Sequence, residues 1–410
     1  MSLKKQTLIS FFLILCIMGF FAILSSTMSK NPVLNPFAKS LGTPTDLLGF
    51  VASASTIPGM LISLPAASLS DIFGRRKVLL FAAFVFASAP FLYLLVTVWW
   101  QLVLVRFYHG FATAIFIPVT EAIIAERYPT KRGERISILE SATAIGRASA
   151  PFLGGAILFL TNDGFHTLYL AVGIAGVIAF IVTLLFITEE KNPEAKQSKN
   201  QQTASNIFHG WHEIAKNKGA LVTGMVQASQ YYVYGAVEFF LVGYLLDVAK
   251  LNLILISIIT GSQIIILIIG RPFLGRISDK TGRRTPIITG SIISAITLLV
   301  FPFTTQFSIL LLLSIVYGLG FAMVISSTSP LICEQVPSTL VGSSLGFLAT
   351  TMDIGQTVGP VISGIILSSI LHYNAMFYSL SALLISSCLI FNFSRIAKNQ
   401  VTSENKTQTT

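Results

Sequence analysis

The chain has 410 residues, of which 53% are hydrophobic and only 11% are charged, with a formal net charge of +10. A soluble globular protein carries about 25% charged residues. So low a charge content excludes a soluble enzyme and indicates a protein whose surface faces lipid. The excess of basic residues points to an anionic partner, and their distribution along the chain decides between a nucleic acid and a membrane.

Twelve apolar runs follow one another along the chain, each about 20 residues long and so able to cross a bilayer as a helix. Lys4 and Lys5 precede the first run, but no small-residue cleavage site follows it, so we predict a retained helix and not a signal peptide. The composition and the runs together predict an all-α membrane protein. The runs are centred near residues 18, 58, 88, 112, 148, 178, 232, 262, 294, 318, 354 and 385.

A long polar stretch separates the first six runs from the last six. Near its end Ile207, Trp211 and Ile214 recur at helical spacing, which predicts a short helix on the membrane surface. His209 and His212 have no cysteine or carboxylate cluster beside them, so no metal site is expected there or elsewhere. The predicted plan is an N-terminal bundle at 1–188, a cytoplasmic linker at 189–218, a C-terminal bundle at 219–396 and a polar tail at 397–410.

The basic residues fall mostly on one side when the chain is threaded from a cytoplasmic N-terminus. Lys30, Lys39 and Lys250 are the exceptions in the external loops. This asymmetry follows the positive-inside rule. It predicts a multi-pass protein of the cell membrane with both termini in the cytoplasm, and it accounts for the net charge without a nucleic-acid partner.

One loop motif occurs twice, about half a chain apart. The two aspartates are 208 residues apart, and Glu126 and Glu334 repeat the same offset. A constant offset across separate motifs indicates that one ancestral unit was duplicated. The copies consist of Asp71, Gly74, Arg75 and Arg76 in the first half, and of Asp279, Lys280, Gly282, Arg283 and Arg284 in the second.

These residues resemble the major facilitator superfamily over essentially the whole chain. In that family the loop between helices 2 and 3 reads Gly-x-x-x-Asp-(Arg/Lys)-x-Gly-Arg-(Arg/Lys). The second copy matches fully, whereas the first has Ala67 and Ile72 in place of the glycine and the basic residue. The resemblance implies twelve transmembrane helices in two pseudo-symmetric six-helix bundles.

The loop aspartates suit a gating role. A carboxylate at a helix N-terminus is stabilised by the helix dipole. We therefore expect Asp71 to cap the helix that begins near Gly342, and Asp279 the helix that begins near Arg135, so that each contact crosses between the bundles and closes the cytoplasmic side. The alternative is a basic turn that only fixes the topology.

The fifth run carries a segment of small residues with a central proline. It resembles the antiporter motif of the family, Gly-x-x-x-Gly-Pro-x-x-Gly-Gly, with Ala150 in place of one glycine. In the family this motif marks exporters, particularly drug:proton antiporters. Small residues also allow close helix packing, and the eleventh run carries a copy, so packing is part of its role. The matching positions are Gly146, Pro151, Gly154 and Gly155.

The fourth run carries Arg106 and Gly110, which resemble the family's Arg-x-x-x-Gly element of proton-coupled members. With His109 and Thr113 the arginine forms a polar stripe, which must face a cavity or other helices and not lipid. A buried structural pair is the alternative.

Ionisable residues inside the runs are the remaining candidates, since each costs several kcal/mol in hydrocarbon. Asp353 lies near the midplane and is the first candidate for proton coupling. Arg147, near the equivalent depth, is expected to tune the carboxylates or to meet a substrate anion. The next coupling candidates are Glu238, Glu140 and Glu121. Cavity-lining candidates on the seventh run are Gln227, Gln230, Tyr231 and Tyr234.

The sequence thus predicts a secondary transporter, without cofactor and not an enzyme, that acts as a monomer and exports a small organic compound in exchange for protons. A proton-coupled uptake symporter would share the fold, although Ile187 to Pro193 does not match the segment usual in sugar-uptake members. A receptor or scaffold that does not transport is the other alternative.

Overall fold

The computed structural model describes residues 3–162, 164–187, 213–214, 216–337 and 340–394. The predicted surface helix at 207–214 and the polar tail therefore lie almost wholly outside the described residues. By their contacts the residues form two compact units. Unit 1 comprises 1–190, 237–261 and 360–365, and unit 2 comprises 191–236, 262–359 and 366–410.

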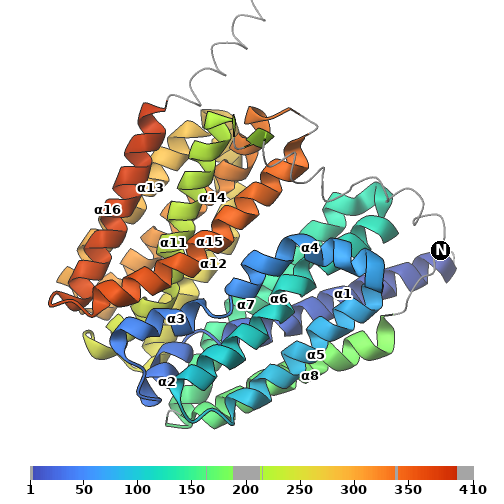
Figure 1. Cartoon of the computed structure of the whole chain (residues 1–410), viewed down its shortest axis with the longest axis horizontal. Coiled ribbons are helices and arrows are strands. Elements are labelled where there is room, and N and C mark those ends of the chain that lie inside the picture. Colours follow the sequence, from blue (N-terminus) through green and yellow to red (C-terminus); the bar gives the residue numbers. More distant parts are fainter. Residues whose placement is uncertain (1–2, 163, 188–212, 215, 338–339, 395–410) are drawn as a thin grey trace, which may run out of the picture. The chain divides into compact units, whose positions relative to one another are not determined.

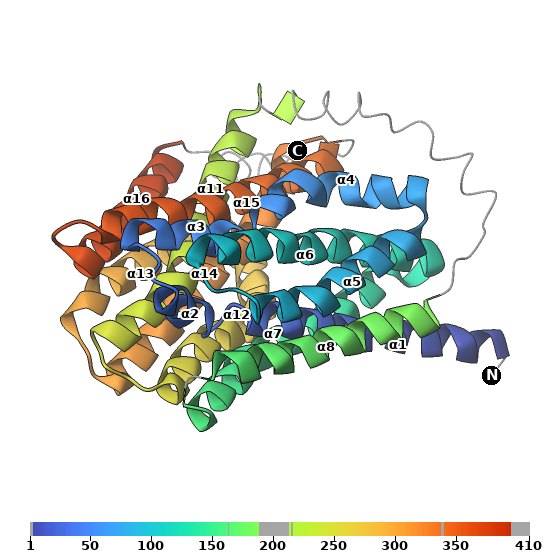
Figure 2. The same cartoon turned by 60° about the horizontal axis from the view of Figure 1, so that its bottom comes forward.

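Unit 1 is built on the helices of the first half of the chain. α5 packs along α8, and α1 packs against both α7 and α8 (Figure 1). α4 and α5 each contact α6, which leaves α6 in the middle of the unit (Figure 2). The helices are α1 (Leu3–Met28), α2 (Leu34–Ser40), α3 (Leu48–Ser53), α4 (Ile57–Phe73), α5 (Arg75–Tyr93), α6 (Trp99–Arg127), α7 (Arg132–Leu160) and α8 (Phe165–Phe186).

The second half of the chain supplies the remaining helices. Within unit 2, α13 packs against α14 and α16. α11, α12 and α15 each contribute one segment to unit 1 as well, so the predicted boundaries of the two bundles stay a prediction. The helices are α11 (Lys218–Asp247), α12 (Leu253–Thr281), α13 (Arg284–Val300), α14 (Phe307–Gln335), α15 (Val341–Leu367) and α16 (His372–Phe393).

Among the described residues, ten segments are long and apolar enough to cross a membrane. The other two predicted spans are α11 and α15, which are helical over 30 and 27 residues. Their polar residues lower their mean hydropathy, because α11 contains two glutamines and a glutamate and α15 contains Asp353. Of these two less apolar spans, α11 carries half of the predicted substrate-cavity residues and α15 carries Asp353.

The second span is broken, which the sequence analysis did not predict. α3 ends at Ser53 and α4 begins at Ile57, with a turn between them. Pro58 lies in the first turn of α4. It has no N–H to donate to the carbonyl of Ala54, so the α-helical ladder is interrupted there. The position 208 residues later is Ile266, and α12 runs through it without a break.

Candidate functional site

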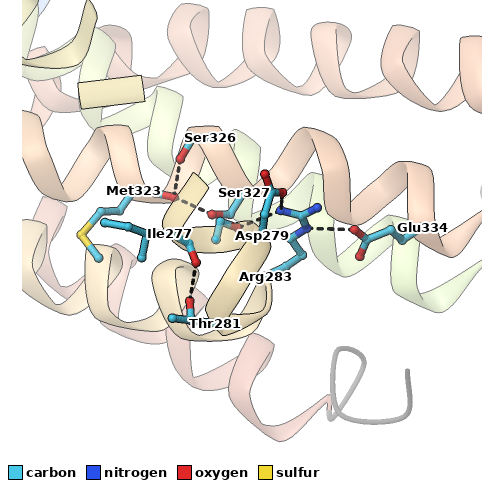
Figure 3. A network of polar contacts seen from close by, with 9 residues as sticks. Ile277, Asp279, Thr281, Arg283, Met323, Ser326, Ser327 and Glu334 are labelled. Atoms are coloured by element: carbon cyan, nitrogen blue, oxygen red, sulfur yellow. Dashed lines mark hydrogen bonds and ion pairs between the residues drawn. The ribbon is translucent and has the colours of Figure 1, made fainter. Parts of the chain in front are cut away.

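The loop between α12 and α13 is held by a network around Arg283 (Figure 3). Its Nε donates to Oε1 of Glu334 at 2.8 Å, and Nη1 donates to Ser278 Oγ at 3.3 Å. Nη1 also forms an ion pair with Asp279. Burial of the guanidinium opposes its charge, but the hydrogen bonds to the two carboxylates outweigh burial and raise the pKa of Arg283.

The first loop repeats this network at identical separations. Arg75 Nη2 donates to Glu126 Oε1 at 2.9 Å, and Arg75 Nη1 bonds to Ser70 Oγ. Arg76 donates to the carbonyl of Leu184 at 3.2 Å. Each separation in sequence recurs in the second half: 51 residues to the glutamate, 5 to the serine and 108 to the last helix, where Arg284 donates to the Asn392 carbonyl at 2.7 Å. Each loop is therefore tied to helices of its own half.

The two loop glycines explain why the motif contains glycine. Gly74 and Gly282 have φ angles of +96° and +82°, which side chains with a β-carbon rarely adopt. Each ends one helix and allows the next to start, with the arginines at or directly before its first residues. Glu126 and Glu334 mark the repeat in the sequence, but they were not predicted to belong to the gating set. Their shared offset with the arginines was the signal.

The predicted inter-bundle caps stay a prediction. Asp279 pairs with Arg283 on its own loop and is otherwise exposed, as is Lys280. The side chain of Asp71 lies outside the described part of the structure.

Arg106 lies against the break in the second span. It is 1% exposed, its Nε donates to the Val51 carbonyl at 3.3 Å, and its Nη2 donates to the Ala52 carbonyl at 3.1 Å and to Ser55 Oγ at 2.6 Å. These carbonyls end α3 and lack partners in the helical ladder. Arg106 therefore caps the broken helix, and its predicted cavity role stays a prediction.

The four-residue spacing of Arg106 and Gly110 now has a physical reason. Residues at i and i+4 share a helix face, and a β-carbon on Gly110 would lie 2.4 Å from the carbonyl oxygen of Ser55. Arg106 and Gly110 thus both contact the break between α3 and α4: the arginine caps the carbonyls, and the glycine leaves room for the backbone. The second half, whose helix is continuous, has Ser314 at the position of the arginine.

The rest of the stripe continues into a buried aromatic group. His109 is 3% exposed, and its Nδ1 lies 3.3 Å from the hydroxyl of Tyr93, which stacks on Tyr169 with ring centroids 4.4 Å apart. Nε2 of His109 is buried without a hydrogen-bond partner among the described residues. Thr113, one turn further on α6, is half-buried. The structure therefore places His109 in the interior of unit 1.

The predicted intramembrane charges are accessible and unpaired within the described chain. Arg147 and Glu140 on α7 are exposed, while Glu121, Glu238 and Asp353 are half-buried, and none of the five forms an ion pair with another described residue. Unpaired charges in contact with hydrocarbon are strongly disfavoured. The exposure of these five charged side chains within membrane spans therefore supports contact with water and not with lipid.

Lys30 is a member of this charged group that the sequence analysis placed in an external loop. Burial lowers its pKa to about 8, the Glu238 carboxylate opposes this shift, and Arg106 and Arg147 add to it. One acidic and two basic groups of unit 1 thus act on Lys30, which follows the end of α1. The position of Lys30 directly after an uninterrupted apolar run was the feature of the sequence that could have indicated its burial.

Replacing Lys30 with methionine should raise the melting temperature of the purified protein at pH 7. The folded-state pKa of about 8 lies below the usual 10.5, so the cost of burying the charge is complete below pH 8 and fades between these values. The gain measured by thermal unfolding in detergent should therefore shrink as the pH rises from 7 to 10. Lys77→Met, at an exposed lysine, is the control, and an equal gain there would contradict the assignment.

In unit 2 the predicted cavity residues of α11 divide into two kinds. Both glutamines bond to neighbouring helices: Gln227 accepts from Thr328 at 2.7 Å, and Gln230 donates to Ser291 at 3.1 Å. The buried Oε1 of Gln230 has no hydrogen-bond partner among the described residues. The tyrosines join an aromatic cluster around Phe321, which Tyr234 stacks at 4.8 Å and Tyr231 meets edge-on at 5.3 Å. The glutamines thus contribute to packing, and the aromatic surface includes a phenylalanine that the sequence analysis missed.

Asp353 follows Met352, which packs against this aromatic cluster. On α15 the face toward α11 is defined by Gly355 and Gly359, where added β-carbons would lie 2.3 Å from the Ala228 carbonyl oxygen and 2.1 Å from that of Tyr232. Asp353 is two residues from Gly355, about 200° around the helix. Its carboxylate is therefore directed away from the α11 contact.

The antiporter-like segment makes a similar close crossing in the first half. A β-carbon on Gly146 would lie 2.5 Å from the carbonyl oxygen of Phe20 on α1. Phe20 and Ala228 are 208 residues apart, so Gly146 and Gly355 perform equivalent packing in the two halves. Gly154, with Pro32 at 3.3 Å, and the buried Pro151 also lie at helix contacts. The packing role that the duplication predicted is supported, and the link to export stays a prediction.

The family model described as Major Facilitator Superfamily matches residues 10–265 and 231–409. The chain belongs to the Major Facilitator Superfamily. It is thus a multi-pass membrane transporter and not an enzyme, and the predicted fold class is confirmed.

Relatives of this transporter cover most of its length. It is 24% identical over 372 residues to an uncharacterized MFS-type transporter of Methanocaldococcus jannaschii, covering 90% of this chain and 93% of the relative. It is 25% identical over 368 residues to the multi-drug resistance efflux pump PmrA of Streptococcus pneumoniae, covering 87% and 89%. A solved D-xylose-proton symporter matches with a TM-score of 0.73 at 18% identity, covering 93% of this chain and 97% of that one, which shows a shared fold.

Proposed function

We propose that this transporter exports small amphipathic organic compounds from the cell in exchange for protons, by alternating access across the cell membrane with both termini in the cytoplasm. The observation that carries the proposal is Asp353, a carboxylate within a membrane helix that has no ion-pair partner among the described residues. Such a carboxyl group is stable either in its protonated form or as a carboxylate next to a cation.

An aromatic cluster within unit 2 packs against Met352, the residue that precedes Asp353 in the sequence. Met352 and Tyr234 lie at the edge of the cluster built on Phe321, and both are partly exposed. Aromatic faces bind apolar rings and attract organic cations. A carboxylate that exchanges its proton for such a substrate would couple export to proton entry. Glu238, Glu140 and Glu121 are the further coupling candidates, and Arg147 would adjust their charge.

Transport in vesicles of known orientation tests the direction. Inside-out vesicles with an acidic lumen should accumulate an organic cation such as ethidium as protons leave, because antiport couples the two opposite fluxes. A panel of neutral aromatic dyes and sugars defines the substrate class. Accumulation that requires protons and substrate to enter right-side-out vesicles together would instead establish the symporter alternative, which the shared fold of the D-xylose-proton symporter keeps open. Absence of transport for every compound in both orientations would favour a receptor.

A further inference from the structure

The end of unit 1 opposite the Arg75 loop contains segments from both halves of the sequence. α2, between the first and second spans, and α3, the first part of the second span, lie there with the end of α11, the start of α12 and residues 360–365 of α15. By the predicted orientation this end is external. We call the contacts among these segments the distal seal, and its members are Lys39, Gly49, Gly155, Asp247, Ser257 and Gly364.

The contacts of the distal seal follow the duplication. A β-carbon on Gly155 would lie 1.7 Å from Ser257 Oγ, so the backbone of α7 packs there directly against the serine side chain of α12. On Gly364 it would lie 3.0 Å from the backbone nitrogen of Gly49. Gly155 and Gly364 are 209 residues apart, and Gly49 and Ser257 are 208 apart. The two crossings are therefore equivalent. In one, a glycine of the first half meets a residue of the second half, and in the other, the equivalent glycine of the second half meets the equivalent residue of the first half.

The third contact of the seal joins two equivalent positions to each other. Lys39 on α2 forms an ion pair with Asp247, the last residue of α11, and they are 208 residues apart. A residue meets its own counterpart only where the two copies face each other symmetrically. The duplicated positions have thus diverged to opposite charges. Nearby, the buried Asn35 donates to the carbonyl of Phe239 at 3.2 Å.

We propose that Lys39 and Asp247 form a latch that holds the distal end closed, on top of the glycine crossings that seal it. The glycine contacts bring the helices close together but carry no charge, so separating them costs only packing. The ion pair adds an attraction that acts between the two halves and that disappears when they part. Opening of the distal end in alternating access, on which this inference rests, must therefore break it.

The equivalence of the two positions gives the latch a specific property. Lys39 and Asp247 occupy equivalent positions in the two halves of the chain. Exchanging the two residues should therefore give an equivalent ion pair. Lys39→Asp places two carboxylates at the contact, and Asp247→Lys places two ammonium groups there. Either variant replaces attraction by repulsion. The double variant Lys39→Asp with Asp247→Lys restores an ion pair with its direction reversed.

Hydrogen–deuterium exchange of the full-length protein in lipid nanodiscs tests the latch. Each single variant should raise exchange on the order of threefold in peptides covering 34–47 and 241–252, as expected for a shifted two-state equilibrium, and the double variant should return to the wild-type rate. Peptides from α13 serve as the internal reference. Lys131→Asp, which breaks the exposed pair of Lys131 with Glu134 on a loop at the other end of unit 1, is the matched control.

The outcomes separate the latch from the transport assignment. The measurement needs neither substrate nor gradient, so it does not depend on direction or coupling. Unchanged exchange in both single variants would overturn the latch, and so would a double variant as open as the singles. Opening that appears equally in Lys131→Asp would show a general effect of charge and would overturn it as well.

Discussion

Asp353→Asn should abolish proton-driven accumulation of substrate while substrate exchange without a gradient continues. Asparagine keeps the size and hydrogen-bonding capacity of aspartate but cannot titrate. If Asp353 carries the coupling proton, the variant retains the conformational cycle and loses only the link to the gradient. Accumulation in inside-out vesicles should fall to the level measured without a gradient, and the pH dependence of substrate binding should flatten.

The conservative variant sharpens this test. Asp353→Glu retains a titratable carboxyl group, so it should keep a measurable part of the uphill transport. If Asp353→Asn still drives uphill export with the wild-type pH dependence, the proton is carried elsewhere, and the same substitution at Glu238, Glu140 and Glu121 identifies the carrier. Loss of both exchange and accumulation in Asp353→Asn would assign the residue to substrate binding and not to coupling.

Gly355→Ala should strongly destabilise the transporter. Its new β-carbon would lie 2.3 Å from the carbonyl oxygen of Ala228 and 2.9 Å from the backbone nitrogen of Tyr232, and backbone atoms cannot turn aside as a side chain does. Overpacking of this kind costs about 1–3 kcal/mol or more. A fall of several degrees in the melting temperature in detergent is expected, together with a lower yield of folded protein.

Gly342→Ala is the matched control on the same helix. It has no neighbouring atom within 4 Å of the added carbon, and alanine favours a helix over glycine by about 0.5–1 kcal/mol. The two substitutions are therefore expected to have opposite signs. Gly146→Ala should behave like Gly355→Ala, because it makes the equivalent contact with Phe20. Tolerance of alanine at both positions would mean that these helices do not cross as closely as described.

The sequence was sufficient to predict the spans, the duplication and the family. Apolar length and a constant offset are properties that sequence displays directly. The break at Pro58 was missed because prolines are common in membrane helices, and only the neighbouring donors decide whether the freed carbonyls are satisfied. The contacts of Arg106 with these carbonyls were not predicted for the same reason, since an arginine on a polar stripe does not reveal which carbonyls it meets.

The kinds of residue at the candidate site were predictable from the sequence, but the residues that they contact were not. The unpaired intramembrane charges were found by their rarity alone. The division between packed glutamines and stacked tyrosines on α11 depends on α13 and α14, which present Ser291, Thr328 and Phe321 at the matching height. Such long-range pairings are fixed by how helices cross, and a single sequence does not record crossing angles.

The closed arginine networks of the two loops have a consequence for biosynthesis. All partners of Arg75 and Arg76 named above lie before residue 185, so the first network is complete in sequence before the ribosome has made any of the second half. Domains generally form in order from the N-terminus during synthesis. The nascent chain can therefore form the hydrogen bonds of its first basic loop early. These bonds hold the arginines on the side of the membrane where they were retained during synthesis. Six further helices are still to be inserted at that stage.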